Sequence, residues 1–169
     1  VAVLGLMTSS CNKSAAPEEG VPVSISVQAP EIGTRSISDG KSVNQVRCIV
    51  FRDGKLIQHN DVTKVIPMIG GTATYETRLI SGQTYKIVFW AEEKDNAYYS
   101  VDYQNATVTV SYGAGNEEKR DAFYKVIEYT VTDGQAAQTV TLKRPFAQLN
   151  YGLSAADKAL ADAVSPIVK

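Results

Sequence analysis

Short runs of apolar residues at alternate positions, separated by turn-forming residues, constrain the fold of this chain more than any other feature. The first run has apolar side chains at every second position: Val21, Val23, Ile25 and Val27. Alternation with a period of two is typical of a β-strand that buries one face. Pro22 stands near its start, and strands tolerate proline mainly at their first residue or at a sheet edge. We therefore predict a half-buried strand at residues 21–27, with Pro22 either at a sheet edge or at the beginning of the strand; an edge strand is the assignment we carry forward.

The segments between the runs have the composition of β-turns. Asp53-Gly54 separates an apolar run at residues 43–51 from another that begins at Leu56. Asp-Gly tolerates the positive φ angles of a type I′ turn, so this segment predicts a β-hairpin. Asp133-Gly134 predicts a further turn after the run at residues 123–131.

Residues 85–91, with the sequence Tyr-Lys-Ile-Val-Phe-Trp-Ala, form the most strand-like run and alternate poorly. Apolar residues on both faces are typical of a central strand that is covered on both sides. Residues 154–164 are the one helical stretch, with Ser154 as N-cap and Pro166 beyond its end. Together these patterns predict an all-β fold, an antiparallel β-sandwich of about seven strands with one short C-terminal helix.

The first eleven residues form an uncharged apolar run that ends in small residues and Cys11. This run is too short to cross a bilayer as a helix and has the character of a signal peptide. Thr8-Ser9-Ser10-Cys11 resembles the bacterial lipobox, although Thr8 replaces the usual leucine. We expect Cys11 to be acylated and to anchor the protein, because two or more acyl chains hold a protein stably on a membrane. The alternative is an ordinary signal peptide that contains a cysteine.

These features divide the chain into four parts. Residues 1–11 are the signal-peptide remnant with the lipobox, and residues 12–20 are small, polar and suited to a flexible tether. The sandwich domain is expected at residues 21–153. Residues 154–169 are expected to contain the helix and the start of a further C-terminal domain.

The composition argues against several functions. The 17 basic and 18 acidic residues are interspersed, so the chain has no basic stripe of the kind that binds nucleic acid. With one histidine, His59, the sequence gives no basis for a His-rich metal site or a Ser-His-Asp triad. We expect no catalytic activity, no metal and no cofactor. Cys48 lies in an apolar run and is expected to be a buried thiol.

Further motifs resemble the fimbrillin-like lipoproteins of Bacteroidota, which are related to the type V pilins. They are Phe51-Arg52-Asp53-Gly54-Lys55 between two strands, the run at residues 85–91, and Arg120-Asp121-Ala122-Phe123 combined with the segment at residues 142–149. The resemblance extends from residue 21 to about residue 157 and is closest to a branch distinct from the major pilins. It implies a transthyretin-like, Greek-key sandwich, lipid-anchored in the outer membrane at the cell surface, and a structural, anchor or adhesive role in a fimbria.

The resemblance also implies an assembly mechanism. In the pilins of this group the first strand is removed by cleavage after an arginine in the following loop, and the vacated groove accepts a strand from another subunit. Here the removable strand would be residues 21–27, and Arg35 occupies the matching loop. Other fimbrial subunits would be the partners, through strand addition. The alternative for Arg35 is an exposed arginine without such a role.

A group of tyrosines suggests a different function. Tyr98, Tyr99 and Tyr103, with Tyr112 nearby, would stack on sugar rings if they were exposed together. The chain would then be a surface glycan-binding lipoprotein of a polysaccharide uptake system. The other interpretation is that these rings pack within the sandwich, because aromatic side chains dominate protein cores.

Overall fold

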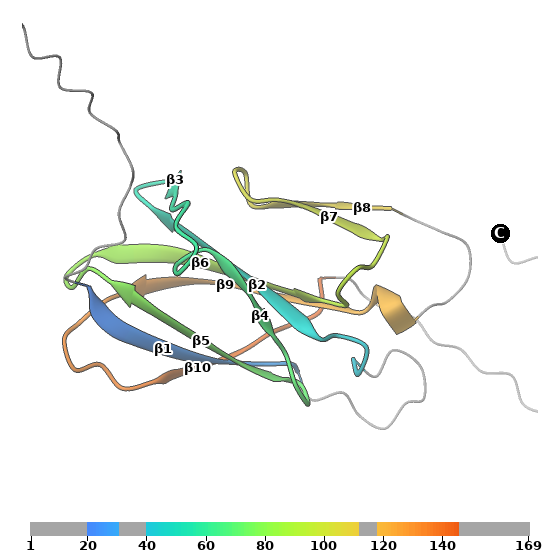
Figure 1. The fold of residues 1–169 in the computed structure, drawn as a ribbon, viewed down its shortest axis with the longest axis horizontal. Helices are drawn as coiled ribbons and strands as arrows, with labels where there is room; N and C mark the ends of the chain where they lie inside the picture. Colours follow the sequence, from blue (N-terminus) through green and yellow to red (C-terminus); the bar gives the residue numbers. More distant parts are fainter. Residues whose placement is uncertain (1–19, 31–39, 112–117, 146–169) are drawn as a thin grey trace, which may run out of the picture.

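The structure, a computed structural model, describes residues 20–30, 40–111 and 118–145, which form ten strands and one short 3₁₀-helix (Figure 1). The predicted helix at residues 154–164 lies outside the described residues. The elements are β1 (Val21–Gln28), β2 (Gln45–Arg52), β3 (Lys55–Leu56), β4 (Lys64–Pro67), β5 (Thr72–Leu79), β6 (Thr84–Glu92), β7 (Tyr99–Asp102), β8 (Thr107–Val110), η1 (Glu118–Arg120), β9 (Ala122–Thr130) and β10 (Gln138–Thr141). No helix among the described residues is long and apolar enough to cross a bilayer.

The strands form two main sheets that pack face to face. One sheet has the order β10-β1-β5, and the other has the order β3-β2-β6-β9 with β4 also paired to β2. The β7–β8 hairpin forms a separate two-stranded sheet, which lies on the far side of the second sheet from β1 (Figure 1). The predicted all-β sandwich is therefore confirmed.

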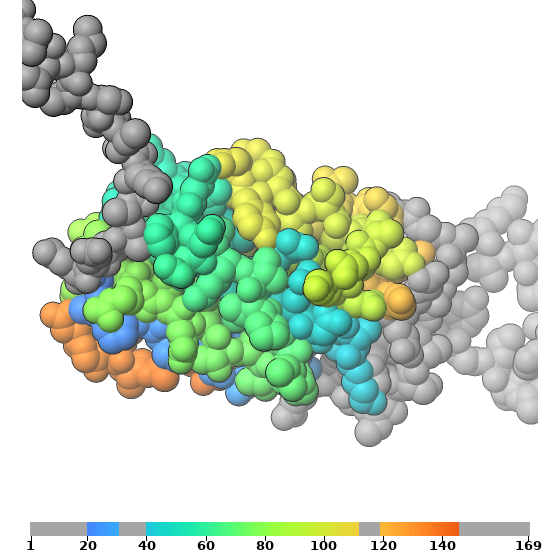
Figure 2. All heavy atoms as spheres, in the orientation of Figure 1, coloured from blue at the N-terminus to red at the C-terminus, as the bar shows by residue number. Residues whose placement is uncertain are grey.

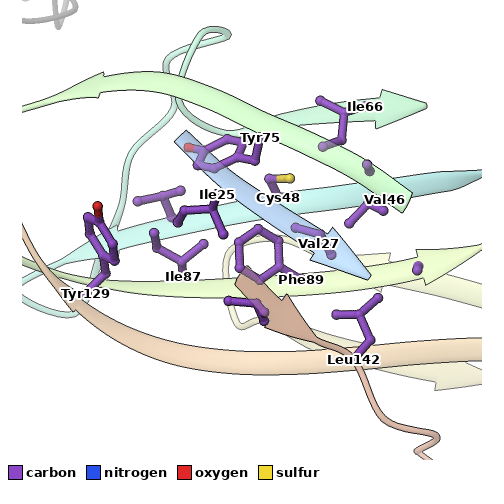
Figure 3. Close-up of a cluster of buried hydrophobic side chains, with 14 of the residues drawn as sticks. Ile25, Val27, Val46, Cys48, Ile66, Tyr75, Ile87, Phe89, Tyr129 and Leu142 are labelled. Carbon is purple, nitrogen blue, oxygen red and sulfur yellow. The ribbon is translucent and has the colours of Figure 1, made fainter. Parts of the chain in front are cut away.

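The core lies between the two main sheets, where the inward positions of each strand meet (Figure 3). The ring of Tyr75 on β5 packs edge-on against Phe89 on β6, with 5.9 Å between ring centroids. Tyr75 satisfies its buried hydroxyl by donating a 2.6 Å hydrogen bond to the carbonyl of Val62. Cys48 lies in the same core as a buried free thiol, as expected from the sequence.

Two local predictions are confirmed in detail. The strand predicted at residues 85–91 is β6, which lies between β2 and β9 and has buried residues on both of its faces. The Asp-Gly turn joins β2 to β3, with φ angles of 52° at Asp53 and 72° at Gly54. Both patterns depend only on neighbouring residues, so they can be recognised from the sequence alone.

The prediction that β1 is an edge strand is wrong. β1 pairs with β5 on one side over all eight of its residues and with β10 on the other side through Ile25–Gln28. Pro22 lies in the half of β1 that β10 does not reach, so its missing N–H removes no hydrogen bond to β10. The β1–β10 pair is also parallel, unlike the expected antiparallel pairing, because the chain crosses from β9 in the other sheet to reach β10.

Candidate functional site

The groove that holds β1 between β5 and β10 is the first candidate functional site of the molecule. The predicted residues Val23, Ile25 and Val27 are buried in the core, and Val21 packs against it partly buried. Backbone hydrogen bonds hold the end of the strand: Leu142 donates to Gln28, and Ala29 donates to Gly71, each over 2.8 Å. At its start, a Cβ atom on Gly20 would lie 3.0 Å from the backbone nitrogen of Leu79, so the two strands approach closely there.

A buried carboxylate lies on the outer face of the second sheet, the face that points away from the core. Glu92 ends β6 with 0% of its surface exposed and accepts three side-chain hydrogen bonds. Arg47 Nε donates to Oε1 over 2.6 Å, Gln45 Nε2 donates to the same oxygen over 3.1 Å, and Trp90 Nε1 donates to Oε2 over 2.8 Å. These partners compensate the loss of hydration that burial of a carboxylate causes.

The same cluster connects the sheet to the β7–β8 hairpin. Arg47 donates a second hydrogen bond, over 3.0 Å, to the hydroxyl of Tyr103 at the hairpin turn. Burial alone would lower the pKa of Arg47, but the hydrogen bonds with Tyr103 and Glu92 outweigh it and raise that pKa. We call Gln45, Arg47, Trp90, Glu92 and Tyr103 the Glu92 cluster. Sequence reasoning misses it, because Glu92 begins a run of polar residues that resembles a loop.

The three tyrosines predicted for glycan contact belong to the hairpin and its approach, and all are partly buried. Tyr99 packs edge-on against Trp90 at 5.2 Å and donates its hydroxyl to the carbonyl of Arg120. The guanidinium of Arg120 stacks on the ring of Tyr98 at 4.8 Å. Since Tyr103 is bonded to Arg47, each of the three rings contacts another part of the protein, and glycan contact by them stays a prediction. Tyr112 lies outside the described residues.

An apolar cleft of about 340 Å³ lies between the hairpin and the outer face of the second sheet. Figure 2 shows the hairpin, in yellow, along one border of the molecule. Such a volume is near the lower end of the range for ligand pockets, about 300–1,000 Å³. The apolar residues that line the cleft include Val88, Trp90, Val101, Val108, Val110 and Val126.

A second buried carboxylate brings together two of the motifs that carry the family resemblance, those that contain Asp121 and Arg144. Asp121, which is 5% exposed, accepts a 2.9 Å hydrogen bond from Arg144 and a 2.8 Å bond from the backbone nitrogen of Gly40. The guanidinium of Arg144 also lies 5.4 Å from the ring centre of Phe123. Asp121 therefore joins the start of β9 to the segment after β10 and to Gly40 in the segment before β2.

Two predicted sites, Cys11 for lipidation and Arg35 for processing, lie outside the described residues. The structure places Cys48 away from solvent, and burial raises the pKa of its thiol to about 12. His59 is partly exposed beside Asp61, with Nδ1 3.7 Å from the carboxylate. Within the ranges that the structure describes, no group of three or more His, Cys, Asp or Glu side chains is arranged to hold a metal ion.

Two solved structures match the chain. One is a fimbrial assembly protein from Parabacteroides distasonis, with 17% identity and a TM-score of 0.42, matched over 74% of this chain and 52% of that protein. The other, described as a candidate polysaccharide-binding protein (DUF1812) from Bacteroides thetaiotaomicron, has 16% identity and a TM-score of 0.40, over 72% of this chain and 46% of that protein. The chain thus spans about half the length of each.

No curated protein matches the chain. A family model does match, and it covers residues 15–163, which include every described strand. The chain therefore belongs to the DUF6562 family, a family of unknown function.

Proposed function

We propose that this protein is a non-catalytic, surface-associated subunit of a fimbria-like assembly. It is anchored by lipid at Cys11 and joins its neighbours by exchange of the strand at the β1 position. The proposal combines the processing signal of residues 1–11, the resemblance to fimbrillin-like lipoproteins and the geometry around β1. The role is structural or adhesive, with another subunit as the partner.

The observation that supports it best is the position of β1 within its sheet. The strand contributes three buried apolar side chains, and β2, the next strand along the chain, belongs to the other sheet. A cut between β1 and β2 would therefore leave β1 held only by its pairing with β5 and β10 and by its packing in the core. Arg35 stands in that connection.

The central position of β1 means that the groove it would leave is bordered by a strand on each side. If β1 leaves, the groove offers unpaired backbone groups of β5 on one side and of β10 on the other. An incoming strand with the same alternation would regain both sets of hydrogen bonds and fill the sites of Val23, Ile25 and Val27. In strand addition, backbone bonds give the affinity and alternate side chains give the specificity.

The experiment is treatment of the full-length protein with an arginine-specific protease, followed by N-terminal sequencing and size-exclusion chromatography. We expect a new N-terminus at Ser36 together with polymers. Arg35→Ala should abolish both, whereas Arg78→Ala, which alters an exposed arginine of β5, should leave both unchanged. Polymers that form equally well from Arg35→Ala, or a protein cut after Arg35 that stays monomeric, would contradict the proposal.

A further inference from the structure

The outer edge of β9 is a second surface suited to strand pairing, distinct from the groove that holds β1 between β5 and β10. Among the described residues, β9 pairs with β6 along its length, and on its other side only Tyr124 is bridged, to Lys143. The N–H and C=O groups of Tyr124 therefore point away from β6, toward Lys143. Because these directions alternate along a strand, the backbone groups of Val126 and Glu128 point the same way. Within the described part of the chain they therefore form an open hydrogen-bonding edge.

The apolar cleft under the hairpin opens beside this edge. Val126 lies on β9 opposite Val88 of β6, and both residues line the cleft. Val126 is 43% exposed, so this apolar residue is accessible to a partner. A strand that pairs with Val126 would place its own side chain next to Val126, at the mouth of the cleft. Backbone groups and a side-chain site thus coincide, as they do in peptide recognition by strand addition.

The charge on this edge is negative at one position. Glu128 is exposed on the same face as Val126, and its cross-strand neighbour is Lys86. The ammonium group of Lys86 lies 6.0 Å from the ring centre of Phe51, on the side away from β9. Within the described part of the chain, Glu128 forms no ion pair. A basic side chain directly opposite Glu128 would be favourable, since opposite charges across a strand pair stabilise it.

The same features disfavour symmetric pairing with a second copy of this chain. A two-fold axis at Ile127 would place Thr130 of the second copy opposite Tyr124, where Lys143 already pairs. A two-fold axis at Glu128 would place two glutamates directly opposite each other, and like charges there are destabilising. Charged residues on an edge strand commonly prevent such self-association.

We propose that the edge of β9 from Val126 to Thr130 docks an extended strand of a different protein, paired antiparallel. This strand has a basic residue opposite Glu128 and, two positions later, a large apolar residue that enters the cleft beside Val126. The direction is antiparallel because the bridge between Tyr124 and Lys143, on the same edge, is antiparallel. The interaction is independent of exchange at β1 and uses the other sheet.

The test measures binding of short labelled peptides to the full chain by fluorescence anisotropy. In the matched peptide, threonine alternates with the two test residues, and an arginine is followed two positions later by a leucine. In the control peptide the leucine comes first and the arginine follows two positions later. We expect the matched peptide to bind more tightly. Glu128→Lys should weaken that binding about fivefold or more, as a favourable cross-strand pair becomes repulsive. Glu76→Lys, on an exposed glutamate of β5, should not.

Hydrogen exchange on the free and peptide-bound protein gives a second readout that does not depend on a variant. In the free protein the amides of Val126 and Glu128 should exchange faster than those of Lys125 and Ile127, which point toward β6. The matched peptide should slow the first pair. Slow exchange of Val126 and Glu128 without peptide, a dimer formed through β9, or equal binding of both peptides would overturn the proposal.

Discussion

The guanidinium of Arg47 donates a 2.6 Å hydrogen bond to Glu92 at a point where the carboxylate has no exposed surface. Arg47 also binds the hydroxyl of Tyr103, so the buried ion pair links the second sheet to the β7–β8 hairpin. An isolated two-stranded hairpin is marginally stable in water. The Glu92 cluster therefore helps to hold the hairpin over the sheet and to form the apolar cleft between them.

Glu92→Ala should lower the free energy of unfolding by about 3–5 kcal/mol, because it leaves the charge of Arg47 and the donors of Trp90 and Gln45 without their acceptor. Urea unfolding followed by circular dichroism measures this change. Glu76→Ala is the matched control, since Glu76 is exposed, and should change the free energy by less than about 0.5 kcal/mol. Equal effects of the two variants would show that the buried cluster contributes nothing.

Tyr103→Phe should loosen the hairpin while it preserves the ring. Loss of the hydrogen bond from Arg47 should cost about 0.5–1.5 kcal/mol and speed hydrogen exchange in β7 and β8. Tyr124→Phe is the control, because no hydrogen bond of the Tyr124 hydroxyl is found among the described residues. Unchanged exchange in the hairpin of Tyr103→Phe would contradict the role of this contact.

Asp121 and Arg144 should show strong energetic coupling. A double-mutant cycle with Asp121→Ala and Arg144→Ala should give about 1–3 kcal/mol, as expected for a charged hydrogen bond to a buried carboxylate. Chemical unfolding of the two single variants and the double variant gives the value. Strict additivity of the two substitutions would mean that the 2.9 Å contact is energetically neutral.

Cys48 should resist thiol reagents until the protein unfolds. Burial raises the pKa of its thiol from 9.0 to about 12, so at pH 8 only about one molecule in 10,000 would be a thiolate. Reaction with a chromogenic disulfide should therefore be slow in the native protein and rapid in urea. Fast reaction of the native protein would show that the thiol is accessible.

The same shift has a consequence for stability at high pH. The folded state holds the Cys48 proton more tightly than the unfolded state, so the favourable contribution is complete below about pH 9 and is lost as the pH rises toward about 12. Burial also raises the pKa of Tyr75, which acts in the same direction. Cys48→Ala should therefore reduce the dependence of the unfolding free energy on pH in this range.

The sequence alone predicts correctly those elements whose signals come from neighbouring residues. The residues of β6 form a continuous apolar run, and Asp53-Gly54 requires no distant partner to adopt its turn. The position of β1 within its sheet is different, because it depends on β10, more than a hundred residues later. No local pattern in β1 distinguishes a strand with one neighbour from a strand with two.

The two buried carboxylates could not be predicted from the sequence for a related reason. Glu92 and Asp121 stand in charged runs that resemble solvated loops, and their partners Arg47 and Arg144 lie 45 and 23 residues away. One signal was available: Glu92 is two residues after Trp90, so alternation along β6 places both side chains on one face. The lipidation of Cys11 and the processing of Arg35 stay predictions, since both residues lie outside the described ranges.

Native mass spectrometry of the protein cut after Arg35 tests exchange at the β1 position most directly. The cut monomer should retain the N-terminal fragment that contains β1, held by β5, β10 and the core. Polymers formed from it should lack that fragment, because a strand from the neighbouring subunit occupies its place. Polymers that still contain one N-terminal fragment per subunit would contradict strand exchange.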